Sequence, residues 1–145
     1  MILSSCELVL AKKDNCKMNR LIIDATNNKI FLMIINKDIK YSITHENSKN
    51  NYEKLTLLIN EFLTSYNLDL KKISKIYVNR GPGSFAGIRN SLSIVKAFYL
   101  VNKIDYYCFS FDDFNEKTEV KYENVPKLCE KLKVRKNLIN PIYLS

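Results

Sequence analysis

Residues 80–89 read Arg-Gly-Pro-Gly-Ser-Phe-Ala-Gly-Ile-Arg, and they hold all three glycines of the 145-residue chain. Elsewhere the turns are filled with asparagine, which indicates that glycine is kept only where another residue does not fit. Glycine reaches positive φ freely and lets another backbone or a ligand approach the main chain closely. The segment is therefore predicted to be a specialised turn.

Hydrophobic periodicity on both sides of this turn gives the order of the elements. In chain order, the expected elements are strands at 20–25, 29–35 and 39–44, a helix at 51–66, a strand at 75–78, a helix at 88–101 and a strand at 106–109. The alternation at 39–44 predicts a strand at the sheet edge with one wet face. The order β-β-β-α-β-α-β predicts an α/β fold, with a mixed sheet covered by helices.

Bulk composition limits the classes of protein to which the chain can belong. Its length and 46% apolar content predict one domain, and its net charge of +8 favours polyanionic partners such as RNA or an acidic protein surface. A basic excess spread over solvated faces is the simpler interpretation of that charge. Cys6, Cys16, Cys108 and Cys129 form no C-x-x-C pair and His45 is the only histidine, so no zinc site is expected. Without a membrane-spanning apolar run, a cytoplasmic protein with reduced thiols is expected.

Two catalytic classes have a partial match at the level of pattern. Gly81-x-Gly83-x-x-Ala86 with Asp105 about twenty residues on resembles a dinucleotide fingerprint, but three strands and a helix precede it, which disfavours that class. No Lys-Ser or Lys-Thr pair follows the last glycine, so a Walker A loop is not expected either.

The second class is a metal-dependent ribonuclease H-like nuclease, which has the same element order. Asp24 and Glu53 stand at suitable places, but the strand at 75–78 continues into Asn79-Arg80 without a third acid, so no metal is expected. The simpler roles are hydrogen bonding at the strand end for Asp24 and a first-turn helix acid for Glu53.

The whole segment 80–89 closely resembles the R-G-P-G-S-F-T-G-[LV]-R signature of the TsaB family, the tRNA threonylcarbamoyladenosine biosynthesis proteins. The sequence Ile-Ile-Asp at 22–24 is similar to the opening strand of that family, and Glu-Lys-Leu at 53–55 resembles its H-S-E-x-L segment. Asn-Pro-Ile-Tyr-Leu at 140–144 is similar to its closing P-x-Y-L, and the main resemblance covers residues 18–114. Two polar residues of the family are replaced, a threonine by Ala86 and a histidine by Asn51.

The resemblance implies the N-terminal lobe of an actin-like ATPase fold and a protein that is not itself the catalyst. Members of the family pair with TsaD, the catalytic subunit that transfers threonylcarbamoyl to adenosine 37 of tRNA, and a third protein, the ATPase TsaE, joins them. A non-catalytic scaffold with possible tRNA contact inside the complex is therefore expected, and a homodimer or a degenerate non-binding remnant stays open. The two helices are implied to form the subunit interface or to pack in the core, with these candidates: Leu55, Ile59, Phe62, Leu92 and Val95.

The signature loop is expected to support that interface as a tight turn, with an anion contact at the helix start as the alternative. Pro82 fixes φ, Gly81 and Gly83 allow the reversal, Ser84 caps the helix and Gly87 permits close helix approach. Arg80 and Arg89 are suited to partner carboxylates or phosphates. The loop residues singled out are Arg80, Gly81, Pro82, Gly83, Ser84, Phe85, Gly87 and Arg89.

The chain is expected to divide into an extension at 1–17, a lobe at 18–115 and a residual tail at 116–145. Translation is expected to start at either Met1 or Met18. The second lobe of the fold is expected to be reduced to this tail, with one short helix at 125–132, so no ATPase activity and no cofactor are expected. The tail has a basic cluster that either touches tRNA phosphates or forms a solvated face. Its members are Lys127, Lys131, Lys133, Arg135 and Lys136.

Overall fold

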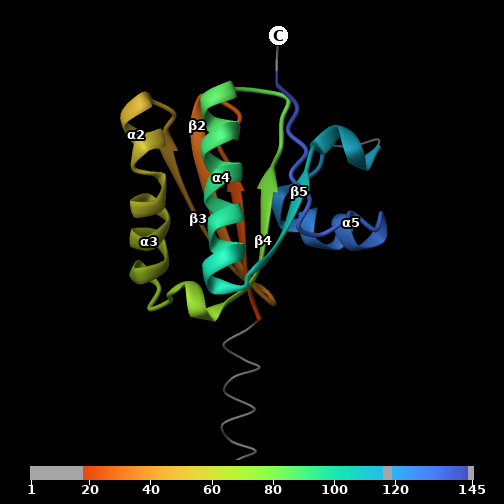
Figure 1. Cartoon of the computed structure of the whole chain (residues 1–145). Coiled ribbons are helices and arrows are strands. Elements are labelled where there is room, and N and C mark those ends of the chain that lie inside the picture. The colour runs from red at the N-terminus through yellow and green to blue at the C-terminus, as the bar shows by residue number, and fades with distance from the viewer. Residues whose placement is uncertain (1–17, 116–118, 144–145) are drawn as a thin grey trace, which may run out of the picture.

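The computed structural model describes residues 18–115 and 119–143 (Figure 1). The strands are β1 (Asn19–Asp24), β2 (Lys29–Asn36), β3 (Ile39–Glu46), β4 (Ile73–Asn79) and β5 (Asp105–Phe109). The helices are α2 (Lys49–Glu53), α3 (Leu55–Ser65), α4 (Phe85–Asn102) and α5 (Val125–Lys131), with short 3-10 helices at Leu70–Lys72, Phe111–Phe114 and Tyr122–Asn124. The extension expected at 1–17 lies outside the described residues.

The five strands form one mixed sheet in the order β3-β2-β1-β4-β5. β1 pairs with β2 and β2 with β3 in antiparallel fashion, whereas β4 runs parallel to both β1 and β5. The predicted α/β fold with an antiparallel opening and parallel strands afterwards is therefore confirmed, and so is the edge position of β3. Parallel strands bring the ends of β1 and β4 to the same edge of the sheet, where the glycine loop begins.

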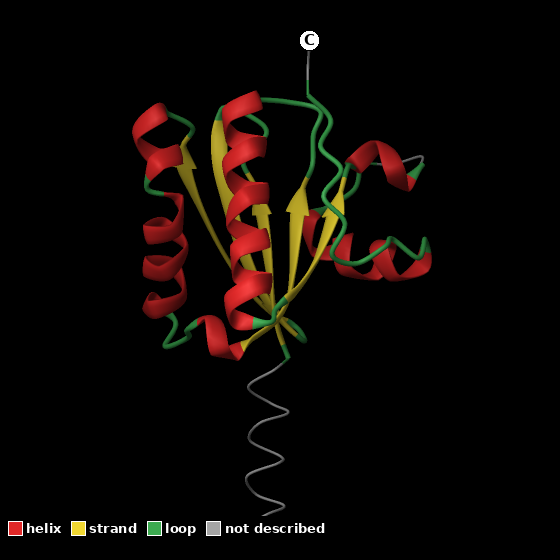
Figure 2. Cartoon of the chain, in the orientation of Figure 1, coloured by secondary structure: helices red, strands yellow, loops and turns green. Residues whose placement is uncertain are grey.

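Each face of the sheet is covered by its own helices (Figure 2). The larger cluster lies under α3 and α4 and includes Leu21 and Ile23 of β1, while Ile22 between them packs in the smaller cluster with Val125 and Cys129 of α5. Successive side chains of a strand point to opposite faces, so a central strand buried on both faces reads as a continuous apolar run. This explains why the sequence of β1 shows no alternation.

Two details differ from the sequence-based expectations. The helix expected at 51–66 is two helices joined at Lys54, whose φ of −99° and ψ of 11° leave the α region. The first of them is tied to the end of β3, because Asn51 Nδ2 donates to the Glu46 carbonyl at 2.6 Å. Glu53 consequently ends α2 instead of standing in a first turn, so its predicted role as a first-turn acid is wrong.

The apolar residues of β3 are the second difference. The alternation predicts one covered face, but Ile39, Tyr41 and Ile43 all remain exposed. Tyr41 stacks on Tyr66, with ring centroids 3.8 Å apart.

The described part of the tail packs back onto the sheet through α5, as the second cluster shows. The expected boundary between 115 and 116 adjoins residues outside the described part, and it stays a prediction. Among the described residues, no helix combines the length and the apolar character needed to cross a membrane.

Candidate functional site

The glycine loop leaves β4 at Asn79 and enters α4 at Phe85, and its three glycines are places where another backbone comes into contact. A Cβ atom at Gly81 would lie 2.2 Å from the Ile142 carbonyl oxygen, and one at Gly83 would lie 2.3 Å from the Thr26 carbonyl oxygen. Gly81 also has a φ of +114°, a region that side chains disfavour. The loop is thus wedged between the turn that follows β1 and the end of the described chain.

Polar contacts fix the start of α4 in the same place. The Ser84 hydroxyl accepts the Gly87 N–H at 3.3 Å as the predicted cap, and it shares a hydrogen bond of 2.9 Å with the Tyr52 hydroxyl. The Ser84 N–H donates to the Thr26 carbonyl at 2.9 Å. The Ser84 hydroxyl therefore already has two partners within the chain, and its role as the cap is structural.

The closing segment, residues 140–143, runs back across the glycine loop, so the two segments that resemble TsaB patterns lie side by side (Figure 1). The Ile142 N–H donates to the Arg80 carbonyl at 2.7 Å, and Tyr143 forms a bridge with Gly83. The Tyr143 ring lies 4.7 Å from that of Phe85. The closing segment and the glycine loop therefore form one structural unit.

Asp24 lies at the centre of this edge of the sheet and is 1% exposed. Its Oδ1 accepts the Thr26 N–H at 3.0 Å and the Thr26 hydroxyl at 2.7 Å. Its Oδ2 accepts Asn79 Nδ2 at 2.9 Å and the Tyr122 hydroxyl at 2.5 Å. Burial and the Asp24 carboxylate raise the pKa of Tyr122, which keeps that phenol protonated as a donor. The expected hydrogen-bonding role of Asp24 at the strand end is confirmed.

The nuclease alternative finds no support in this geometry. Asp24 accepts four hydrogen bonds from the chain itself, and Glu53 is exposed at the end of α2. No group of three or more His, Cys, Asp or Glu side chains suited to a metal ion occurs within residues 18–115 and 119–143. Two of the four donors, Asn79 and Tyr122, were missed at the sequence level, although the polar Asn79 at the end of an apolar strand was a readable signal.

The dinucleotide pattern does not assemble either. Asp105 begins β5 and pairs in register with Lys75 near the start of β4, at the opposite end of the strands from the glycine loop. Its carboxylate accepts Asn137 Nδ2 at 2.9 Å. An acid placed there cannot reach a ligand held at the loop.

The two arginines of the signature have different environments. Arg80 donates to both carboxylate oxygens of Asp113, at 3.3 and 2.7 Å, and to the Asn140 carbonyl at 3.1 Å, so it holds the chain together. Arg89 is exposed on α4. A hollow of about 480 Å³ beside the loop is lined by uncharged residues, among them Asn28 and Asn47. The anion contact at the loop stays a prediction, with Arg89 as the arginine still accessible.

The five interface candidates are all buried in the core, and each is at most 3% exposed. They belong to the cluster between the sheet and the two helices α3 and α4: Leu55, Ile59, Phe62, Leu92 and Val95. A partner can contact them only if the chain rearranges, and their part in an interface stays a prediction. Helical spacing identifies the apolar face of a helix but not whether the sheet or a partner covers it. The exposed residues on the outside of the same helices were therefore not singled out from the sequence.

The basic tail cluster is exposed, as a solvated face requires. The cluster runs from the first turn of α5 to the segment after it, and Lys136 Nζ lies 3.7 Å from Asp105 Oδ2. Its members are Lys127, Lys131, Lys133, Arg135 and Lys136. Cys108 and Cys129 are free and buried thiols.

Comparison with known proteins gives a consistent family match. Residues 35–110, just over half of the chain, match the family model "TsaD: tRNA N6-adenosine threonylcarbamoyltransferase". Two curated relatives, both described as tRNA threonylcarbamoyladenosine biosynthesis protein TsaB, come from Buchnera aphidicola. The protein from subspecies Baizongia pistaciae is 30% identical over 55% of this chain, and that from subspecies Schizaphis graminum is 28% identical over 62%. The matched segments span 36% and 43% of those relatives.

Among solved structures, YeaZ from Pseudomonas aeruginosa superposes with a TM-score of 0.59 at 17% identity. The match covers 63% of this chain and 43% of that one. The predicted fold class, the N-terminal lobe of an actin-like or ribonuclease H-like protein, is confirmed by this likeness.

Proposed function

Because the chain belongs to the family of TsaB- and TsaD-type proteins, we propose that it is a subunit of the machinery that makes tRNA N6-threonylcarbamoyladenosine. In this proposal it binds and stabilises a TsaD-type catalytic subunit without performing chemistry itself. A TsaE-type ATPase and the tRNA then join the same complex. The observation that carries the proposal is that the two segments resembling the TsaB patterns, 80–89 and 140–143, pack into one unit.

The non-catalytic role is supported by the state of the buried acid. Asp24 is the only buried carboxylate among the described residues, and both of its oxygens accept hydrogen bonds from Thr26, Asn79 and Tyr122. A general base or metal ligand needs a lone pair directed at its target. Here the lone pairs of Asp24 are directed at the donors of its own chain.

The partner surface in this proposal is the outer side of α4. Ser93, Ala97, Leu100 and Val101 follow each other at helical spacing on the side turned away from the sheet, and we call these four residues the α4 outer face. Leu100 is 58% and Val101 77% exposed. Small residues beside large apolar ones let a second helix approach closely and bury apolar area. Helix-on-helix packing is therefore the mode of association that we propose.

The test is size-exclusion chromatography with light scattering on this protein mixed with the TsaD homologue of the same genome. The proposal predicts a 1:1 complex at micromolar concentration. Leu100→Arg would place a charge in the contact, and we expect it to weaken the complex at least tenfold. Leu132→Arg is the matched control, because Leu132 is 44% exposed at the end of α5, which covers the other face of the sheet.

Folding of both variants is checked by their melting temperatures, since both side chains are exposed and neither change should unfold the chain. Separate elution of the wild-type proteins, also with tRNA and nucleotide present, would refute the subunit proposal. Equal binding of Leu100→Arg and Leu132→Arg would refute the α4 outer face as the contact.

A further inference from the structure

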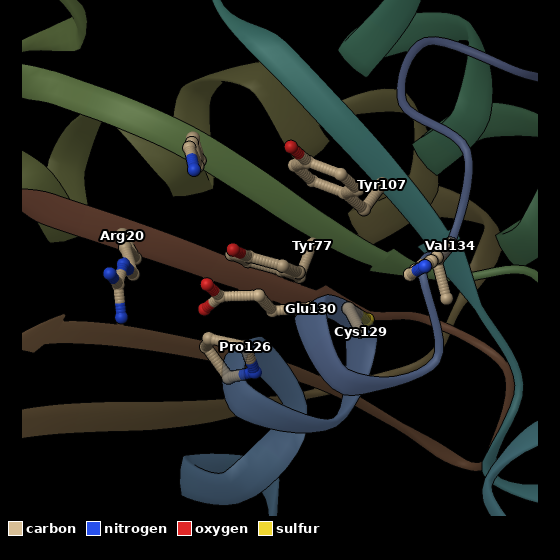
Figure 3. Close-up of a pocket in the computed structure, with 9 residues that line it drawn as sticks. Arg20, Tyr77, Tyr107, Pro126, Cys129, Glu130 and Val134 are labelled. Atoms are coloured by element: carbon tan, nitrogen blue, oxygen red, sulfur yellow. The ribbon is translucent and has the colours of Figure 1, made fainter.

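A second pocket of about 360 Å³ lies between the sheet and α5, on the face opposite to α4 (Figure 3). Three cations line it, and they are Arg20, Lys75 and Lys133. The hydroxyl-bearing rings of Tyr77 and Tyr107 line it as well, and one acid, Glu130, faces it from α5. It has none of the residues of the glycine loop.

The strand register brings these groups together. Arg20 of β1 pairs with Lys75 of β4, and Tyr77 of β4 pairs with Tyr107 of β5. Lys75 and Tyr77 are two residues apart and therefore point to the same face. The two tyrosine rings stack with centroids 5.1 Å apart, and Lys75 Nζ lies 5.8 Å from the centre of the Tyr107 ring.

Lys133 reaches the pocket from the turn that ends α5. That turn is closed by hydrogen bonds from the Lys133 N–H to the Glu130 carbonyl at 3.1 Å and from the Val134 N–H to the Cys129 carbonyl at 3.0 Å. Lys133 itself has a φ of 54°. The pocket is thus assembled from the start of β1, the middle of β4 and β5, and α5 with the turn that ends it.

The lining has a surplus of hydrogen-bond donors. In the described part of the chain, no protein acceptor forms a hydrogen bond or ion pair with the side chains of Arg20, Lys75 or Lys133. Asp105 is the register neighbour of Lys75, but its carboxylate is engaged by Asn137 and lies 3.7 Å from Lys136.

Tyr77 adds another donor, because it is a protonated phenol at neutral pH. Burial raises its pKa to about 12, although the nearby Arg20 acts in the opposite direction. An anion is the ligand class that fits a pocket rich in donors with Glu130 as its one acidic side chain.

We propose that this pocket binds a phosphomonoester of about the size of a nucleoside monophosphate. The three cations and Glu130 leave two positive charges, which match the charge of about −2 that a phosphomonoester carries at pH 7. The volume is at the small end of the range for ligand sites. The ligand is either a free nucleotide or the 5′-phosphate of an RNA. The proposal does not depend on the TsaD-type partner, because α4 lies on the other face of the sheet.

The test is isothermal titration calorimetry of the full chain at low salt with inorganic phosphate, AMP and adenosine. Phosphate and AMP should bind and adenosine should not. Lys133→Gln removes an exposed cation without disturbing the core, and Arg20→Gln removes the guanidinium. Each substitution should lower the affinity for AMP at least tenfold. The matched control is Lys127→Gln, an exposed lysine of α5 that does not line the pocket, and it should leave the affinity unchanged.

Affinity for AMP should also fall between pH 7 and pH 5, because the second phosphate proton has a pKa of about 6. Two RNA oligonucleotides of one sequence, with a 5′-phosphate or a 5′-hydroxyl, distinguish the sources. Preference for the phosphorylated RNA over AMP identifies an RNA end, and binding of AMP alone identifies a free nucleotide.

Three results would overturn the proposal: equal binding of adenosine and AMP, no binding of AMP or phosphate at millimolar concentration, or equal losses in Lys127→Gln and Lys133→Gln. The Leu100→Arg variant should bind AMP as the wild type does, so failure of the partner proposal and failure of this one are distinguishable.

Discussion

A methyl group at position 87 has no room, because α4 crosses the turn after β1 at Gly87. The added Cβ atom of Gly87→Ala would lie 1.9 Å from the Ala25 carbonyl oxygen and 3.1 Å from Tyr52 Cε1. Gly87 lies inside the helix, so its φ does not require glycine. The substitution therefore isolates the close approach of two backbones from any effect of backbone conformation.

The magnitude follows from the overlap. Ordinary contact begins at 3.4 Å, so α4 would have to move by about 1.5 Å, which a close-packed interior resists. Overpacking of this kind costs about 3 kcal/mol, at the upper end of its usual range, because the opposing atom belongs to the backbone. Replacing glycine by alanine in a helix returns up to about 1 kcal/mol. The expected net loss is about 2 kcal/mol, or roughly 8 °C in melting temperature for a domain of this size.

Urea unfolding followed by circular dichroism measures this loss. Ser93→Ala, at an exposed position of the same helix, is the control, and it should change the stability by less than about 0.5 kcal/mol. If Gly87→Ala is as stable as the wild type or more stable, the close approach of α4 to Ala25 does not exist, and the reason given for this glycine is wrong.

Three further predictions concern buried polar groups and thiols. Tyr122→Phe removes the hydroxyl that donates to Asp24 at 2.5 Å and should cost about 1.5–3 kcal/mol in urea unfolding, whereas no measurable loss would mean that this bond does not form. Burial raises the pKa of Cys108 to about 11 and that of Cys129 to about 12, so both thiols should stay unreactive towards Ellman's reagent at pH 8 in the native protein. Rapid labelling of Cys108 or Cys129, distinguished from Cys6 and Cys16 by peptide mass spectrometry, would contradict their burial. The pKa values of the Cys108 and Cys129 thiols and of Tyr77, which is raised to about 12, are higher in the folded state than in the unfolded state. Their contribution to the free energy of unfolding is therefore fully present below pH 9. That contribution should be lost as the pH rises from 9 through 12, and a melting temperature that is constant up to pH 12 would contradict it.

The order of strands and helices could be predicted because its signals are local. Period-two and helical spacing are properties of short segments, and the position of β3 at the edge follows from its polar face. The glycines were equally informative, because glycine at Gly81 and Gly87 is explained by contacts that only a backbone without a side chain permits.

Pairs of residues far apart in the sequence could not be predicted in the same way. Tyr122 donates a hydrogen bond to Asp24 across 98 positions, and the local sequence of neither segment predicts that the two residues meet. The pocket under α5 is a similar case. Arg20 and Lys75 become neighbours only once β1 is known to pair with β4 in that register.

Burial on the helices shows a limit of a different kind. Spacing identified Phe62 and Val95 as parts of apolar faces, but an apolar face packs equally well on a sheet or on a partner. In the described structure these faces cover the sheet. The proposed partner contact therefore lies at Leu100, on the outer side of α4. In the sequence, Leu100 is only an apolar residue outside the helical spacing.

Reconstituted tRNA modification tests whether this protein is a non-catalytic subunit that supports a TsaD-type enzyme. The TsaD homologue of the same genome is incubated with threonylcarbamoyl donor and tRNA, and threonylcarbamoyladenosine is quantified by mass spectrometry of the digested nucleosides. No product is expected from this protein alone. Both proteins together should give product, which Leu100→Arg should reduce and Leu132→Arg should not. Equal product from the TsaD homologue with and without this protein, or product from this protein alone, would contradict it.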